Sequence, residues 1–140
     1  MSYADIDWLD DPQFRVGIDT VHGVVRSEKL TVQTADDVDR YIDALTLILT
    51  GARQRFGHAL VLADLRDAPI RSQLAAERLR QHNLKLYHPG ERVALLVSSS
   101  LLKMQLRRNL VPEYQEIFMS ERAAILWLQA SNYQLPAARS

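Results

Sequence analysis

The sequence predicts a single α/β domain built on a mainly parallel central sheet of about five strands, with an N-terminal hairpin edge and about four helices. Three observations lead to this fold class: a long amphipathic segment at residues 35–56, two short apolar runs at 58–65 and 92–97, and a helical pattern between those runs. A length of 140 residues suits one hydrophobic core, since two smaller domains would each be marginally stable.

The segment 35–56 is the clearest element. Its apolar side chains return every three or four residues, which places them on one face of a helix. Thr34 followed by Asp37 resembles a capping box, in which each side chain accepts a hydrogen bond from the other residue's backbone N–H. Gly57 suits the left-handed conformation that commonly ends a helix. The sequence therefore bounds this helix at both ends.

The two apolar runs, 58–65 and 92–97, are short and flanked by helix-breaking residues. This pattern is typical of strands that are buried on both faces of a sheet. Between them, residues 72–88 carry apolar side chains at helical spacing, and Pro89 and Gly90 end that helix. A strand, a helix and a second strand in this order imply a right-handed crossover and parallel pairing.

The same order continues towards the C-terminus. We expect a helix from Ser100 to about residue 110, a short strand near residues 117–119 and a helix at about 120–129. The last eight residues, 133–140, contain a proline and small side chains and are expected to form a loose tail.

The N-terminal part has a different pattern. Residues 14–19 and about 23–28 alternate in polarity and are joined by little more than a turn, which predicts an antiparallel hairpin at one edge of the sheet. Residues 1–11 are expected to form an N-terminal arm, so that the core spans about 14–129 of a single domain covering 1–140.

Composition excludes several functional classes. Seventeen Lys and Arg balance seventeen Asp and Glu, so no overall positive field attracts nucleic acid. The chain has no cysteine, which excludes disulfides, thiolate chemistry and Cys-based zinc sites. Its acidic start lacks the features of a signal peptide, and no apolar stretch is long enough to span a bilayer. We expect a cytoplasmic bacterial protein that binds no nucleic acid.

The histidines do not have the spacing of a metal site. None forms a pair four residues apart on a helix, and the chain contains no His-Glu-x-x-His pattern. We therefore expect no metal. His82 continues the apolar stripe of the helix at 72–88, so we expect it in the core or at its boundary with one hydrogen-bond partner, rather than as a proton shuttle.

The order of elements and three short motifs resemble a known family. The motifs are Val-Leu-Ala-Asp-Leu-Arg at 61–66, Arg-Val-Ala-Leu-Leu-Val at 92–97 before a run of serines, and a final helix containing Trp127 and Leu128. Together they resemble the STAS domain of anti-sigma-factor antagonists, in particular the small stand-alone bacterial members of the SpoIIAA-like family. The similarity spans most of residues 14–129 and implies a regulatory domain that binds a protein partner or a small ligand.

The chain departs from the STAS pattern at the phosphorylation site. In STAS antagonists, a serine that follows an Asp at the end of the corresponding strand is phosphorylated and switches partner binding. Here Asp64 is followed by Leu65, Arg66 and Asp67, and the first serine is Ser72. No residue of this chain therefore matches the phosphorylated serine, and the partner stays unidentified.

A candidate ligand site lies at the carboxyl ends of the predicted parallel strands, where open α/β sheets bind ligands. Serines at the start of a helix offer hydroxyls beside unpaired backbone N–H groups, which suits a carboxylate or phosphate. The simpler alternatives are that a serine caps the helix, and that Asp64 is held in a turn or paired with Arg66 or Arg71. The candidate ligand-binding residues are Asp64, Arg66, Ser72, Ser98, Ser99 and Ser100.

The helix predicted after residue 100 has two apolar stripes. One stripe is expected to face the sheet, and the other is a candidate surface for a protein partner or a second subunit. The alternative is that this second stripe packs under the C-terminal helix. The residues of the candidate partner surface are Leu101, Met104, Arg107, Arg108 and Val111.

Two functions follow from these features. The first is a non-enzymatic STAS-like regulatory or protein-interaction domain, with a protein partner or a homodimer. The second is a small-molecule or anion-binding domain, for a lipid or phospho-ligand, with its pocket at the carboxyl ends of the strands. The sequence shows no nucleophile beside a base and no cofactor fingerprint, so it favours binding over catalysis and predicts no cofactor.

Overall fold

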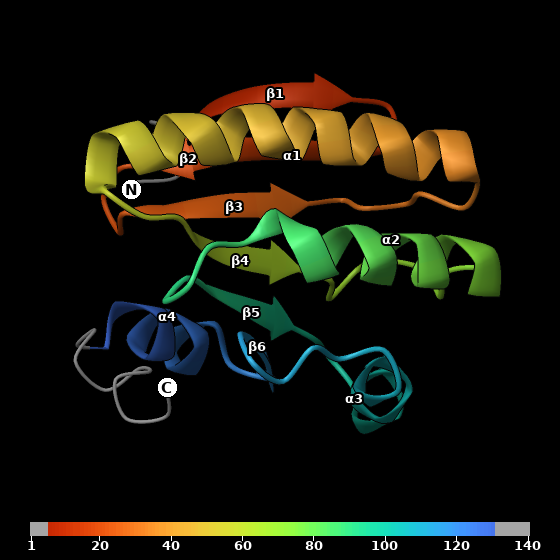
Figure 1. The fold of residues 1–140 in the computed structure, drawn as a ribbon. Coiled ribbons are helices and arrows are strands. Elements are labelled where there is room, and N and C mark those ends of the chain that lie inside the picture. The colour runs from red at the N-terminus through yellow and green to blue at the C-terminus, as the bar shows by residue number, and fades with distance from the viewer. Residues whose placement is uncertain (1–5, 131–140) are drawn as a thin grey trace.

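A computed structural model of the chain describes residues 6–130. Six strands form one mixed sheet whose spatial order, β1-β2-β3-β4-β5-β6, is also their order along the chain (Figure 1). The first three strands pair antiparallel, and β3 to β6 pair in parallel. The predicted α/β domain with a hairpin edge and a parallel body is confirmed. The strands are β1 (Asp7–Asp11), β2 (Phe14–Asp19), β3 (Val24–Glu28), β4 (Leu60–Asp64), β5 (Arg92–Leu96) and β6 (Gln115–Phe118).

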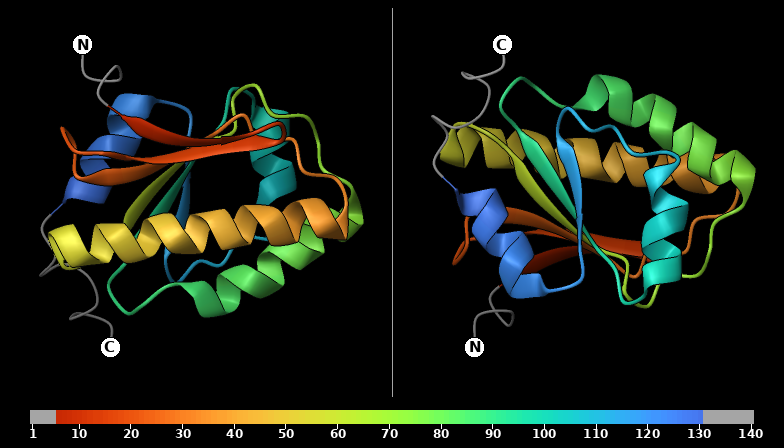
Figure 2. Two further views of the ribbon diagram at one scale, coloured as in Figure 1. Left: turned by 90° about the horizontal axis from the view of Figure 1, so that it is seen from above. Right: turned by 90° about the horizontal axis from the view of Figure 1, so that it is seen from below.

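Four helices pack around this sheet in the described part of the chain. The two longest cover one face, α4 covers the opposite face, and α3 lies near the end towards which β4 and β5 run (Figures 1 and 2). The helices are α1 (Ala35–Phe56), α2 (Gln73–Leu86), α3 (Ser100–Arg107) and α4 (Glu121–Gln129).

Helix α1 begins and ends as its sequence predicts. The Thr34 hydroxyl accepts a hydrogen bond from the Asp37 backbone N–H, and the Asp37 carboxylate accepts one from the Thr34 N–H in return. Gly57 ends the helix in the left-handed conformation, with a φ of 83°. The buried side chains of α1 all lie on the predicted apolar stripe, which packs on the sheet.

The central strands are buried on both faces, as their apolar runs predict. Residues of β4 and β5 pair in register from Leu60 beside Arg92 to Asp64 beside Leu96. Alternate side chains of these strands belong to two separate hydrophobic clusters. The larger cluster lies under α1 and α2, and the smaller one lies under α4, where Ala124 and Leu128 are fully buried.

The structure adds a sixth strand where the sequence predicted an arm. Residues 7–11 pair antiparallel with β2, from Asp7 opposite Ile18 to Asp11 opposite Phe14. Acidic residues interrupt the polar and apolar alternation here, which hides the strand from pattern analysis. The exposed carboxylates suit an outer edge, since charge there discourages pairing with other chains. The rest of the predicted arm, 1–5, and the predicted tail, 133–140, lie outside the described residues.

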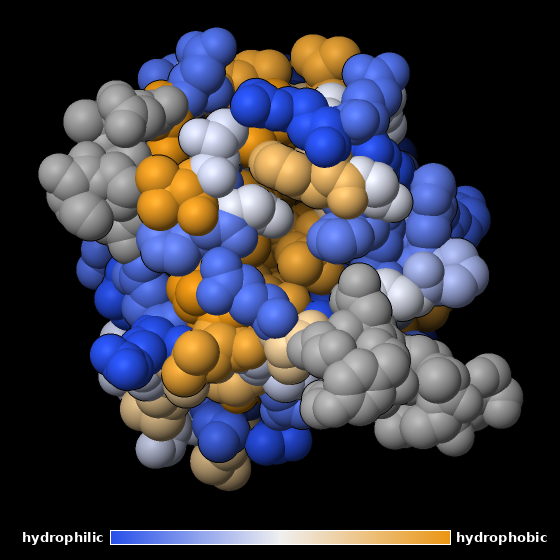
Figure 3. Space-filling view, turned by 90° about the vertical axis from the view of Figure 1, so that its left-hand side faces the viewer, coloured by the Kyte–Doolittle hydropathy of each residue, from blue (hydrophilic) through white to orange (hydrophobic). Residues whose placement is uncertain are grey.

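The side of the molecule at which α1 ends exposes apolar side chains in patches between hydrophilic ones (Figure 3). Isolated exposed apolar residues are normal for a folded domain. Within residues 6–130, no helix combines the length and hydropathy needed to cross a bilayer.

Candidate functional site

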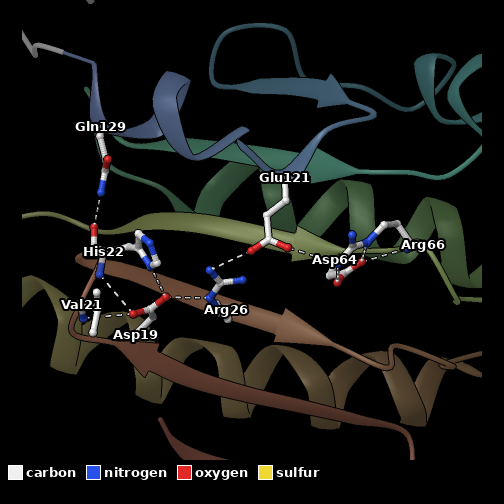
Figure 4. A network of polar contacts seen from close by, with 8 residues as sticks. All are labelled: Asp19, Val21, His22, Arg26, Asp64, Arg66, Glu121 and Gln129. Atoms are coloured by element: carbon white, nitrogen blue, oxygen red, sulfur yellow. Dashed lines mark hydrogen bonds and ion pairs between the residues drawn. The ribbon is translucent and has the colours of Figure 1, made fainter. Parts of the chain in front are cut away.

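Three of the six predicted ligand residues come together at the carboxyl end of β4, and Figure 4 shows two of them, Asp64 and Arg66. Arg66 binds Asp64 through two nitrogens, with Nη2 2.7 Å from Oδ2 and Nε 3.0 Å from Oδ1. The Ser98 hydroxyl donates a hydrogen bond to the Arg66 carbonyl oxygen over 3.0 Å. Of the two ion pairs that the sequence left open for Asp64, the structure contains the one with Arg66 and not the one with Arg71.

The other serines lie at helix starts. The Ser72 hydroxyl accepts a hydrogen bond from the backbone N–H three residues later and donates one to the Gln33 carbonyl oxygen over 2.8 Å. The Ser99 hydroxyl caps α3 in the same way. Ser100 is the first residue of α3 and is exposed. Capping accounts for the hydrogen bonds of Ser72 and Ser99 without a ligand.

The Asp64 and Arg66 pair is one end of a longer chain of charges (Figure 4). Arg66 Nη2 also lies 3.3 Å from Oε1 of Glu121, at the start of α4, and Oε2 of Glu121 lies 3.2 Å from Nη2 of Arg26. Arg26 Nε donates to Oδ2 of Asp19 over 2.8 Å. Acidic and basic groups thus alternate from β2 through β3 and α4 to the end of β4.

The inner end of this chain is buried. Asp19 is 0% exposed and Arg26 is 2% exposed. Burial acts to raise the pKa of Asp19, but hydrogen bonds from Arg26 and His22 outweigh it and hold the pKa below its usual value. The pKa of Asp64 is lowered in the same way, because its hydrogen bonds from Arg66 outweigh its burial. Both carboxylates stay ionised at neutral pH, which suits ion pairing and does not suit general acid catalysis.

A cavity of about 470 Å³ lies elsewhere, between α2, α3 and the face of β4 and β5 that α1 and α2 cover. Its sheet wall is formed by Val61, Ala63, Val93 and Leu95 and by the polar Gln115 of β6. The loop after β4, the inner sides of α2 and α3, and part of α1 also line it. The cavity therefore reaches the carboxyl ends of the strands, but none of the six predicted ligand residues lines it.

The polar residues of the cavity are basic or neutral. Three arginines line it, Arg71, Arg80 and Arg108, and no Asp or Glu does. Among the described residues, the buried Nε of Arg71 and the buried Oε1 of Gln105 have no hydrogen-bond partner. Burial, opposed in part by Tyr41, lowers the pKa of the Arg71 guanidinium. An arginine nevertheless remains charged in a protein, and the partly exposed Arg71 forms no ion pair with a carboxylate of residues 6–130.

Sequence reasoning did not identify the cavity residues. Arg71 follows a proline and an isoleucine and precedes the helix cap Ser72, a context that gave no sign of burial. The one available signal was the absence of an acidic residue between Asp67 and Glu77, which leaves Arg71 without a local partner. Arg108, which was predicted to lie on a partner surface, is a cavity residue as well.

Four of the five residues of the predicted partner surface are exposed. Leu101 and Met104 are 62% and 66% exposed on α3, and Arg107 and Arg108 are exposed beside them. Val111 is 6% exposed, so its place on this surface was wrong. The prediction continued the helix to about residue 110, whereas α3 ends at Arg107 and the following turns direct Val111 inwards.

His82 lies where its sequence context predicts. The Nε2 of His82 lies 3.3 Å from Oδ1 of Asp39, and the ring is partly buried at the edge of α2. This confirms His82 as a boundary residue with one hydrogen-bond partner. Across residues 6–130, no three His, Asp or Glu side chains are grouped so as to hold a metal ion.

Comparison with protein-family models, with curated protein sequences and with solved structures found no match. What the structure shows is an α/β fold with a six-stranded mixed sheet and four helices in the described residues. Fold alone does not assign function, so function has to be argued from the site.

Proposed function

We propose that this chain is a small-molecule-binding domain and that its ligand occupies the cavity between α2, α3 and the sheet. The observation that carries the proposal is the cavity itself. Its volume of about 470 Å³ lies within the range of about 300–1,000 Å³ typical of ligand pockets. Its walls also combine a mostly apolar lining with a few polar groups, as ligand sites do.

The packing of the core supports this proposal. Protein interiors are normally packed without large voids, because a cavity loses the contacts that its lining atoms would make. Here Tyr41, Leu79 and Val93 belong to the main hydrophobic cluster and also line the cavity. A ligand with an apolar body restores the contacts that these side chains lack.

The wall formed by α3 is the place where we expect the ligand to enter. This helix has eight residues and none of them is fully buried. Elements with few buried apolar contacts open at the lowest free-energy cost. Leu102 and Leu106 are its partly buried cavity residues, so displacing α3 exposes the apolar wall to solvent.

Filling the cavity tests the proposal. Ala76 lines the cavity from α2, and Ala76→Trp is expected to abolish binding of an apolar probe such as naphthylethanol. In the wild-type protein, a probe at about a hundred times its dissociation constant adds about 2.7 kcal/mol to the free energy of unfolding. Thermal unfolding with and without probe measures this effect as a rise in Tm.

The matched control is Ala123→Trp, which places the same side chain at an exposed position on α4. This variant is expected to bind the probe as the wild type does. The proposal fails when neither naphthylethanol nor its carboxylate counterpart naphthylacetate raises the Tm of the wild-type protein. It also fails when Ala76→Trp, folded by circular dichroism, still binds the probe.

The regulatory function implied by the SpoIIAA-like STAS resemblance is our second candidate. The observation that favours it is the exposure of Leu101 and Met104, two large apolar side chains one turn apart on α3. We propose that a second copy of the chain covers this surface, with Arg107 at its rim. Because α3 is also a cavity wall, a ligand that moves this helix changes the surface that the second copy contacts.

Sedimentation measurements test the second candidate. The wild-type chain is expected to form a dimer at micromolar to millimolar concentration, and Leu101→Lys with Met104→Lys is expected to be monomeric, because burying two charges is costly. Leu126 is equally exposed on α4, and Leu126→Lys serves as the control that leaves the dimer intact. A monomeric wild type at every concentration excludes the homodimer.

A further inference from the structure

We infer that the ligand of this cavity is an organic monoanion, a carboxylate on an apolar body, and that Arg71 binds its charge. The inference rests on the proposed function and adds the chemical class of the ligand. Three features carry it: an unpaired guanidinium group on an anchored backbone, a cavity wall without acidic residues among residues 6–130, and a mainly apolar sheet wall.

The backbone on both sides of Arg71 is held in place by one side chain. The Gln33 amide nitrogen donates to the Ile70 carbonyl oxygen over 3.1 Å, and the Gln33 amide oxygen accepts from the Ser72 backbone N–H over 2.6 Å. The Ser72 hydroxyl donates to the Gln33 carbonyl oxygen over 2.8 Å. These bonds fix the start of the Arg71 side chain, so little ordering is needed when a ligand binds.

Arg71 differs from the other arginines of the interior. Arg26 binds Asp19, Arg53 binds Glu91, and Arg92 donates to two backbone carbonyl oxygens. The Nε of Arg92 is also buried without a hydrogen bond, but for Arg71 neither this atom nor any other side-chain nitrogen has a hydrogen bond or ion pair within residues 6–130. A buried guanidinium nitrogen without a hydrogen bond is costly, and the carboxylate of a ligand would supply the missing acceptor and the opposite charge.

The rest of the cavity lining selects the sign of the ligand's charge. Arg80, whose Nη1 lies 3.7 Å from Oε2 of Glu77, and the exposed Arg108 also line the cavity, and within residues 6–130 no carboxylate does. In a site with low dielectric, these charges attract an anion and exclude a cation. The planar guanidinium fork of Arg71 matches the two oxygens of a carboxylate.

The apolar wall selects the rest of the ligand. Val61, Val93 and Leu79 lie on the cavity side of the sheet and α2, and Tyr41 and Tyr87 add aromatic surface. A small inorganic anion would neutralise Arg71 but would leave these side chains uncovered. A carboxylate with an apolar or aromatic body pairs with Arg71 and also covers these apolar side chains. Gln105 adds a polar group that does not select charge, because an amide offers a donor at one end and an acceptor at the other.

A matched pair of probes tests the inference. Naphthylacetate and naphthylethanol share a carbon skeleton and differ in charge. The wild-type protein is expected to bind the carboxylate about tenfold to a hundredfold more tightly than the alcohol. This is the gain in affinity expected from one charged hydrogen bond between Arg71 and the probe. Arg71→Met is expected to remove this preference while binding the alcohol as before, and Arg71→Lys is expected to retain part of it.

The stability of Arg71→Met gives an independent readout. Because Arg71 is an unpaired cation in the free protein, methionine is expected to raise the Tm in the absence of ligand, and a lowered Tm overturns the ligand-binding role. Arg122→Met, at an exposed position on α4, is the control that changes neither Tm nor probe preference.

The outcomes separate this inference from the proposed function. When the wild type and Arg71→Met bind both probes equally, the cavity binds ligands but the carboxylate assignment is wrong. When neither probe binds the wild type, the proposed function itself fails. Inorganic phosphate and acetate are then compared as competitors of naphthylacetate. If phosphate displaces the probe more effectively than acetate, the carboxylate assignment is overturned in favour of a phosphorylated ligand.

Discussion

Replacing Arg26 with methionine should lower the free energy of unfolding by about 3–5 kcal/mol, the effect expected when a buried ion pair loses one partner. Arg26 is 2% exposed, and its partner Asp19 is 0% exposed. Without Arg26, the Asp19 carboxylate keeps only its hydrogen bonds from the turn that follows β2. Urea unfolding followed by circular dichroism measures the change at neutral pH.

Arg78→Met provides the matched control. Arg78 binds Asp39 through two nitrogens at 3.0 and 2.8 Å, a geometry like that of the buried pairs, but both side chains are largely exposed. Solvent screens such a pair, so its loss is expected to have a much smaller effect. The double variant Asp19→Asn with Arg26→Met should recover part of the stability, since it removes the unpaired charge. Equal losses for Arg26→Met and Arg78→Met would contradict this explanation.

The buried charge chain also shows why the predicted ligand residues at the end of β4 have a structural use. Glu121 links Arg26 to Arg66, and Arg66 binds Asp64. The chain of charges therefore connects the end of β4 to α4 and to the antiparallel edge of the sheet (Figure 4). An acidic residue at the carboxyl end of a strand looks like a ligand site in sequence, but here both of its oxygens accept hydrogen bonds from Arg66.

Most of the fold could be predicted because its signals are local. The capping box at Thr34, the left-handed Gly57 and the three-four spacing between them are all short-range patterns, and they define α1. The buried strands follow from their continuous apolar runs. Strand β1 could not be predicted in the same way, because its pairing with β2 is a tertiary contact and its own sequence is acidic.

The candidate site was less predictable because it depends on what lies near a residue in space. The Asp64 and Arg66 pair joins residues two positions apart, and the sequence suggested it as an alternative. Arg71 matters because α2, α3 and the sheet, which contribute the cavity walls around it, place no carboxylate of residues 6–130 there. Such an absence is a property of the assembled fold, and no local pattern encodes it.

The second large effect is expected at Glu91, which precedes β5. Its carboxylate accepts hydrogen bonds from Arg53 at 2.7 and 2.9 Å, from the Ala59 N–H at 2.8 Å and from the His88 N–H at 2.9 Å. It thereby joins the end of α1, the start of β4 and the turn before β5. Glu91→Gln is expected to cost about 3 kcal/mol of unfolding free energy, since the amide loses the charge and one acceptor.

The pH dependence of this loss identifies its electrostatic origin. Burial acts to raise the pKa of Glu91, but the hydrogen bonds from Arg53, His88 and Ala59 outweigh it, so the folded-state pKa lies below the usual value. The stabilisation is therefore complete above the unfolded-state pKa of about 4.3 and disappears as the pH falls through the lower folded-state value. The difference between wild type and Glu91→Gln should shrink across that acidic range. Glu113→Gln, the same change at an exposed position, is the matched control. A loss at Glu91 that does not change with pH would instead point to altered packing around the amide.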